Sequence, residues 1–160
     1  MPEDIKLDDL YQEVILDHNR HPRNFKKLAD ANAYSHGVNP LCGDDYHLYL
    51  YVDEDGFIKK AGFEGQGCAI SKSSASILTT MIEGKSVKEA EALKHGFIDL
   101  LTTDSTSPDQ KAVLGRLKIF EGVKKFPVRV KCATLIWHAL GDALKDGKKT
   151  LGGENHGNAA

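Results

Sequence analysis

Three cysteines and one aspartate, spread far along the chain, constrain the fold more than any other feature of the sequence. Cys42 and Asp44 flank a single glycine. Twenty-five residues separate Cys42 from Cys68, and 63 separate Cys68 from Cys132. Three thiolates and a carboxylate are a complete set of four ligands for Zn²⁺, which proteins bind tetrahedrally through sulfur, nitrogen and oxygen. The local Cys-x-x-Cys pairs of small zinc motifs are absent from the sequence, so any metal here would be held by the assembled fold.

The length and composition predict one globular domain. The chain has 160 residues, of which 41% are hydrophobic, and this is enough to build a core. We expect a single domain over residues 1–150 and a polar, glycine-rich, disordered tail over residues 151–160. The 21 basic and 23 acidic residues give a net charge of -2 and are spread along the chain. This pattern argues against nucleic acid or an anionic membrane as a partner.

The N-terminal segment and the cysteine count predict the compartment. The first residues contain no apolar core of signal-peptide length, and no later run approaches a membrane span. We therefore expect a cytoplasmic protein. In such a reducing compartment, an odd number of cysteines favours metal binding or thiol chemistry over a disulfide framework.

The first half of the chain predicts a helix followed by a small antiparallel sheet. Apolar residues recur at helical spacing from Leu7 to Ile15, and the pattern stops before Pro22. Residues 46–52 alternate strictly, and one face carries Tyr46, Leu48, Leu50 and Val52. Turn residues at 53–56 lead into a partner strand that begins at Phe57. Residues 33–37 are a weaker candidate for a third strand.

The second half predicts helices. One helix begins at Ala69 and ends with Gly84 as its C-terminal cap, and Ser86 caps the next helix. A third helical run passes through Val113, Leu117 and Phe120, and a last helix covers residues 131–144, with Trp137 and His138 toward its edge. Strands first and helices afterwards indicate an α+β fold, a small antiparallel sheet of about three strands packed against several helices.

This map places each cysteine in a different setting. Cys68 and Cys132 fall at predicted helix N-termini, where free amide groups and the helix dipole favour a thiolate. Cys42 lies in a loop of turn-forming residues, where a reactive thiol can be exposed, and Gly43 lets Cys42 and Asp44 point at one centre. The alternative is three ordinary buried cysteines and a turn aspartate. Their positions beside glycines, in a loop and at helix starts, weaken that alternative.

Histidines are the other possible ligands. His36, His47 and His138 could each supply a nitrogen, but His47 stands on a strand face and His138 in a helix, where packing or solvent accounts for them. The basic run over residues 18–23 is interpreted as a solvated connector rather than a docking surface. A zinc deaminase also uses cysteine ligands, but it requires a His-x-Glu segment and a Pro-Cys-x-x-Cys pair, and the sequence has neither.

Four segments together resemble one family, the U-type iron-sulfur cluster assembly proteins; they are residues 10–24, 39–45, 65–74 and 126–137. The IscU branch of that family has a histidine directly before its last cysteine and a Leu-Pro-Pro-Val-Lys motif. Here Lys131 precedes Cys132, and residues 126–129 read Phe-Pro-Val-Arg. The SufU branch has lysine at that position and a helical insertion between its second and third cysteines, which residues 96–122 would supply. The chain resembles the SufU branch.

The resemblance implies a zinc-dependent sulfurtransferase that takes persulfide sulfur from a SufS-type cysteine desulfurase and passes it to downstream SUF scaffold proteins. It also implies that the zinc ligands are Cys42, Asp44, Cys68 and Cys132. Cys42 matches the family's sulfur acceptor. Arg129 matches a position near the site, where it would hold Asp44 or the partner, unless it is only a solvent-exposed charge at the helix entry.

Two other functions remain open at this point. An IscU-like scaffold would assemble an iron-sulfur cluster on the same ligands, since thiolates bind both zinc and such clusters. A purely structural zinc domain is the third possibility. Lys131 favours the sulfur acceptor over the scaffold, because a protonated lysine is a poor metal ligand and histidine is a good one.

Overall fold

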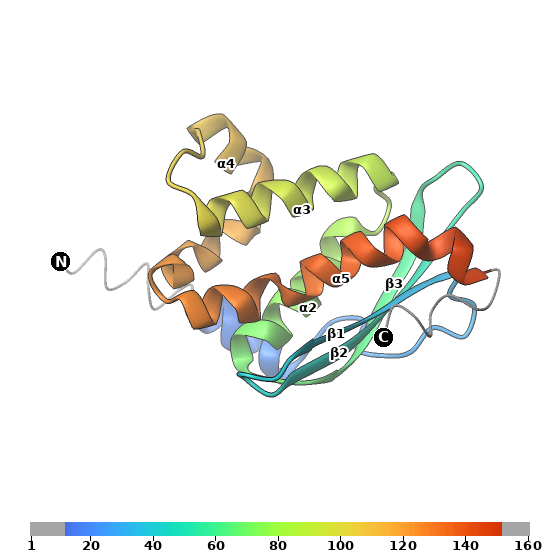
Figure 1. Ribbon diagram of the computed structural model, residues 1–160, viewed down its shortest axis with the longest axis horizontal. Coiled ribbons are helices and arrows are strands. Elements are labelled where there is room, and N and C mark those ends of the chain that lie inside the picture. The colour runs from blue at the N-terminus through green and yellow to red at the C-terminus, as the bar shows by residue number, and fades with distance from the viewer. Residues whose placement is uncertain (1–11, 152–160) are drawn as a thin grey trace.

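The structure is a computed structural model that describes residues 12–151, and the side chains of residues 12–145. Figure 1 shows a three-stranded sheet with α5 crossing it and with α3 and α4 on the far side of α5. Within the sheet, β2 (Asp44–Val52) lies between β1 (Ala33–Asn39) and β3 (Ile58–Gln66), and both pairings are antiparallel. The predicted α+β fold with a small antiparallel sheet is therefore confirmed.

The alternating pattern of β2 fixes which face of the sheet is covered. Tyr46, Leu48 and Leu50 are fully buried against the helices, as the alternation predicts. The predicted turn at residues 53–56 is present, and Gly56 has a φ of +85°. The partner strand begins at Ile58 rather than Phe57, because Phe57 forms an isolated bridge to Ser86 and stays 41% exposed.

Two helices begin at the predicted caps. A helix over residues 12–20 leads to the sheet, and the earlier part of its predicted apolar stripe lies outside the described residues. Helix α2 (Ala69–Ile82) is capped by Cys68. Its C-cap is Glu83, and Gly84 follows with a φ of +86°. Helix α3 (Val87–Thr102) has the predicted cap, since Ser86 and Glu89 form a reciprocal capping box.

The predicted third helical run is two elements. Helix α4 (Pro108–Leu114) ends where Gly115 adopts a φ of +56°, and a 3₁₀ helix, η1 (Gly115–Lys125), follows. Val113 is 71% exposed because it belongs to the short first element, whereas Leu117 and Phe120 of η1 are buried. The prediction of one continuous amphipathic helix through all three residues is wrong.

The last helix is longer than predicted and packs differently. Helix α5 (Pro127–Leu151) begins four residues before Lys131, with proline in the first helical position, where its missing N–H costs nothing. Trp137 is fully buried rather than at an edge; its ring packs 5.4 Å from that of Phe97, and its Nε1 donates to Ser74 Oγ at 3.2 Å. His138 is exposed.

Among residues 12–151, the helices cover one face of the sheet. Helix α5 packs on β1 and β2, α2 packs on β3, and α3 packs on α5. Leu151, placed in the tail by the sequence, ends α5, and the rest of the predicted tail lies outside the described residues. Within residues 12–151, every helix is too short or too polar to cross a bilayer. The arrangement brings the N-terminus of α2 and the start of α5 to the end of the sheet where β1 turns into β2.

Candidate metal centre

The turn between β1 and β2 presents Cys42. The backbone N–H of Cys42 donates to the Asn39 carbonyl at 3.2 Å, and the Gly43 N–H donates to the Pro40 carbonyl at 3.3 Å. Gly43 has a φ of +70°, a conformation that side-chain-bearing residues rarely adopt. This tight turn holds Cys42 half-buried, two residues before the first residue of β2.

That first residue is Asp44, whose carboxylate is fully buried. Its Oδ1 accepts hydrogen bonds from the Cys68 backbone N–H at 3.1 Å and from Ser71 Oγ at 3.0 Å. Its Oδ2 has no hydrogen-bond partner among the described residues. A buried carboxylate oxygen left unpaired is costly unless a cation compensates it, so this atom fits the role of a metal ligand.

Cys68 is the N-cap of α2. Its Sγ accepts the Ser71 backbone N–H at 3.4 Å, which confirms its predicted place at a helix start. The residue before it allows no side chain, because a Cβ on Gly67 would lie 2.5 Å from Asp44 Oδ1 and 2.6 Å from Ser71 Oγ. Glycine at position 67 therefore lets the start of α2 approach the aspartate.

Cys132 is not at a helix N-terminus, and that prediction is wrong. It is the sixth residue of α5, beyond the first turn in which free amides and the dipole act. Its side chain is fully buried, and its Sγ lies 2.9 Å from Cys42 Sγ. Burial, together with the adjacent Cys42, Asp44 and Cys68 side chains, raises the pKa of Cys132 far above its ordinary value. A bound cation would be needed to hold this sulfur as a thiolate.

The four predicted ligands do not lie equally close together. The ligand atoms of Cys42, Asp44 and Cys132 all lie within 4.8 Å of one another. Cys68 falls outside this group, although its N–H holds Asp44 and its side chain lines the same pocket as Cys42. None of His36, His47 and His138 belongs to the cysteine cluster.

Sequence reasoning missed two supporting residues, Ser71 and Tyr46. Ser71 Oγ lies 3.0 Å from both Asp44 Oδ1 and Tyr46 Oη, so it links the carboxylate to the core. The sequence contained a signal for Ser71. It is the third residue of the helix that Cys68 caps, and a capping residue commonly pairs with that position. The sulfurs of Cys42 and Cys132 and the unpaired buried oxygen of Asp44 fit a bound Zn²⁺ ion.

A pocket of about 840 Å³ opens beside these residues. Cys42 and Cys68 lie on its wall, and its rim includes the apolar side chains of Leu41, Phe126 and Val128, which are 72%, 58% and 50% exposed. Arg129 lines the same pocket and is exposed; among the ion pairs of the described residues, none joins it to Asp44. Lys131 is exposed as well. The mouth of the site is therefore apolar with a positive edge.

Residues 10–133 match the family described as NifU-like N terminal domain. The chain belongs to this family. A NifU-like N-terminal structure from Brucella abortus has the same fold, with a TM-score of 0.77 at 22% identity over 89% of this chain and 96% of that one. The predicted membership of the U-type iron-sulfur cluster assembly proteins is thus confirmed.

The chain matches two branches of the family almost equally. It is 42% identical over 134 residues to the zinc-dependent sulfurtransferase SufU of Bacillus subtilis (strain 168), covering 84% of this chain and 88% of that protein. It is 41% identical over 140 residues to the iron-sulfur cluster assembly scaffold protein IscU of Streptococcus pyogenes serotype M1, covering 88% and 86%. A structure from Fervidobacterium islandicum AW-1, described as a candidate scaffold protein for the SUF system, gives a TM-score of 0.75 at 33% identity over 82% and 94%.

Proposed function

We propose that the protein is a zinc-dependent sulfur acceptor that takes persulfide sulfur from a SufS-type cysteine desulfurase during iron-sulfur cluster assembly. The observation that carries this proposal is the contrast between Cys42 and Cys132. Cys42 lies in a turn, half-buried, on the wall of an open pocket, whereas its neighbour at 2.9 Å is fully buried in a helix. A thiol that receives sulfur from another protein must be reachable from outside, and Cys42 meets that condition.

Zinc bound by Cys42, Asp44, Cys68 and Cys132 would keep the sulfurs as thiolates and leave no open position for an activated water. The Cys42 thiolate attacks the outer sulfur of the desulfurase persulfide. A bond forms between Cys42 Sγ and that sulfur as the persulfide S–S bond breaks. The electron pair of the broken bond returns to the desulfurase cysteine, which leaves as a thiolate. Cys42 then carries the sulfur to a downstream SUF scaffold protein.

The rim of the pocket supports docking of a protein partner. Leu41 directly precedes the acceptor, and Phe126, just before α5, and Val128, in its first turn, line the same pocket. Exposed apolar side chains gathered around one reactive group are typical of a protein contact surface. Arg129 adds a positive charge to this rim and is proposed to contact the desulfurase.

The second candidate is a scaffold that assembles a cluster on the same residues. The near-equal identity to an IscU protein favours it, and so does the thiolate set. Lys131 counts against it: the residue adjoining Cys132 is an exposed lysine, and the ammonium group of a lysine side chain offers no lone pair to iron. Lys131→His would be expected to improve cluster assembly only if the scaffold function is the real one.

Mass spectrometry with a SufS-type desulfurase and cysteine tests the proposal. We expect one additional sulfur on Cys42 and faster desulfurase turnover when the protein is present. Cys42→Ala should abolish both effects while retaining binding to the desulfurase through the rim. The control is Val113, which is as exposed as Leu41 of the rim but lies outside the pocket. Val113→Ala should behave as wild type. Persulfide on Cys68 or Cys132, with Cys42→Ala still stimulating the desulfurase, would contradict the assignment.

A further inference from the structure

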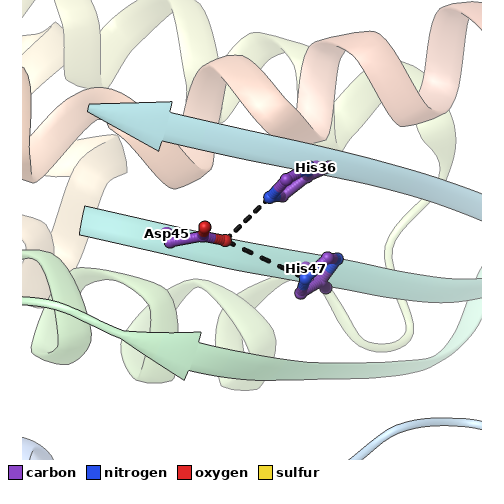
Figure 2. A group of neighbouring side chains, drawn as sticks. All are labelled: His36, Asp45 and His47. Atoms are coloured by element: carbon purple, nitrogen blue, oxygen red, sulfur yellow. Dashed lines mark hydrogen bonds and ion pairs between the residues drawn. The ribbon is translucent and has the colours of Figure 1, made fainter. Parts of the chain in front are cut away.

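A second group of metal-ligating side chains lies on the opposite face of the sheet from the helices. His36 on β1 stands directly opposite His47 on β2 in the strand register. Asp45 precedes His47 by two residues, so both point to the same face of β2. Figure 2 shows the Asp45 carboxylate facing both histidine rings. Three ligand-bearing residues from two strands therefore converge at one point.

Their distances suit a shared ion. His36 Nε2 lies 2.7 Å from Asp45 Oδ1, and His47 Nε2 lies 3.9 Å from the same oxygen. The two imidazole rings are stacked, with centroids 4.2 Å apart and an interplanar angle of 7°. One ligand atom from each residue falls within 4.8 Å of the other two. Two ring nitrogens and a carboxylate oxygen thus already surround a common space.

A neighbouring tyrosine orients His47. Tyr34 Oη lies 2.7 Å from His47 Nδ1, and the two rings stack at 5.9 Å. When Nδ1 donates its proton to the Tyr34 oxygen, Nε2 carries the lone pair and faces Asp45. Metal-bound histidines commonly donate their second nitrogen to such a partner, which fixes the tautomer and the ring orientation. Tyr34 would act as that partner here.

The group can be reached from solvent. The side chains of His36, Asp45 and His47 are 28%, 46% and 34% exposed. The other carboxylate nearby, Glu64, is opposite His47 on β3 and accepts a hydrogen bond from Tyr49 at 2.7 Å. Two imidazoles and one carboxylate are ligands of intermediate softness, and such a set suits Zn²⁺, Co²⁺ or Ni²⁺. Water would fill the remaining coordination positions.

We propose that His36, Asp45 and His47 bind one divalent transition-metal ion at a site separate from the cysteine centre. The separation follows from the pleat of β2: Asp44 and Asp45 are consecutive, so their side chains point to opposite faces. Asp44 is fully buried beneath the helices, and Asp45 is on the open face. The outer site can fill while the cysteine centre is occupied.

Calorimetry and NMR with added Zn²⁺ test this site. Untagged protein, first brought to one bound zinc per chain and freed of excess metal, is titrated with Zn²⁺. We expect a second equivalent to bind and to shift the ring signals of His36 and His47. His36→Ala and His47→Ala should each remove the second binding event, and Tyr34→Phe should weaken it by about 10- to 100-fold, as loss of an outer partner does.

His95→Ala is the matched control, since His95 is an exposed histidine on α3. It should leave the second event unchanged, and circular dichroism should show that every variant keeps its fold. The proposal is overturned if no second zinc binds up to millimolar concentration, or if the second event persists in His36→Ala and His47→Ala. It is equally overturned if binding shifts other ring signals and not those of His36 and His47.

Discussion

Asp44 and Asp45 are neighbours in β2, yet they occupy two very different electrostatic settings. Asp44 is fully buried, held by the Cys68 N–H and Ser71, and keeps one oxygen without a partner among the described residues. Asp45 is 46% exposed beside two histidines. A buried unpaired charge requires a cation as part of the structure, whereas an exposed one only offers a place where a cation can bind and leave. One strand therefore carries the proposed ligand of the cysteine centre and the proposed ligand of the outer site side by side.

The largest expected difference between the two faces is in stability. Cys132→Ser should release zinc and lower the free energy of unfolding by more than about 4 kcal/mol, the range reached when a buried site loses its metal. For a chain of this size, a loss of about 4 kcal/mol corresponds to a fall in Tm of about 8–16 °C. His36→Ala on the outer face should change the stability by less than about 1 kcal/mol. Thermal melts and zinc analysis of both variants measure this difference. Full zinc and an unchanged Tm in Cys132→Ser would refute zinc binding at the cysteine centre.

The next difference concerns the carboxylates themselves. Asp44→Ala removes the oxygen donor and leaves three sulfurs. Sulfur transfer should therefore fall by at least about 10-fold, and the zinc content should fall by less than the transfer activity. Asp45→Ala should leave one zinc per chain in the cysteine centre. Elemental analysis and a desulfurase-coupled transfer assay measure the two quantities separately. Equal loss of zinc and transfer in Asp44→Ala, or loss of neither, would show that the Asp44 carboxylate has no role in sulfur transfer separate from zinc binding.

The smallest expected effect concerns the packing around the cysteine centre. Gly67→Ala places a methyl group 2.5 Å from Asp44 Oδ1 and should cost about 1–3 kcal/mol, as overpacking does. Gly122→Ala is the control, because a Cβ there meets nothing within 4 Å. Urea titrations of the two zinc-loaded variants compare them directly. A Gly67→Ala protein as stable as Gly122→Ala would mean that the start of α2 does not need its close approach to Asp44.

The sequence predicted the covered side of the sheet and the starts of α2 and α3 well, and the start of α5 poorly. Alternation over residues 46–52 predicted the helix-facing side of β2, where Tyr46, Leu48 and Leu50 are fully buried, although Tyr49 on the other face is buried as well. The start of α5 was missed because a proline is compatible with either the end of a loop or the first position of a helix. That error moved Cys132 to a helix terminus it does not occupy. Burial of Trp137 depends on contact with α3, which local periodicity does not report.

The two candidate sites show the same limit. Cys42, Asp44 and Cys68 could be recognised because glycines and a capping position mark them locally. The group of His36, Asp45 and His47 could not be recognised, because it depends on the register between β1 and β2. A shift of one residue in that pairing would move a histidine to the other face. The sequence attributed His47 and His138 to packing or solvent, and it could not show that His36, Asp45 and His47 lie together.

Cys132 follows Cys42 by 90 positions in the sequence, and this separation has a consequence for biosynthesis. Chains emerge from the ribosome N-terminus first, at about 5–20 residues per second. The sheet and α2 are therefore synthesised well before the helix that brings the last sulfur. During that interval Cys42 is exposed without its buried partner, and the nascent chain cannot enclose a metal ion. Cys42 and Cys132 come together only when α5 docks across the sheet, so a metal ion held by both sulfurs would be bound only after α5 has been made.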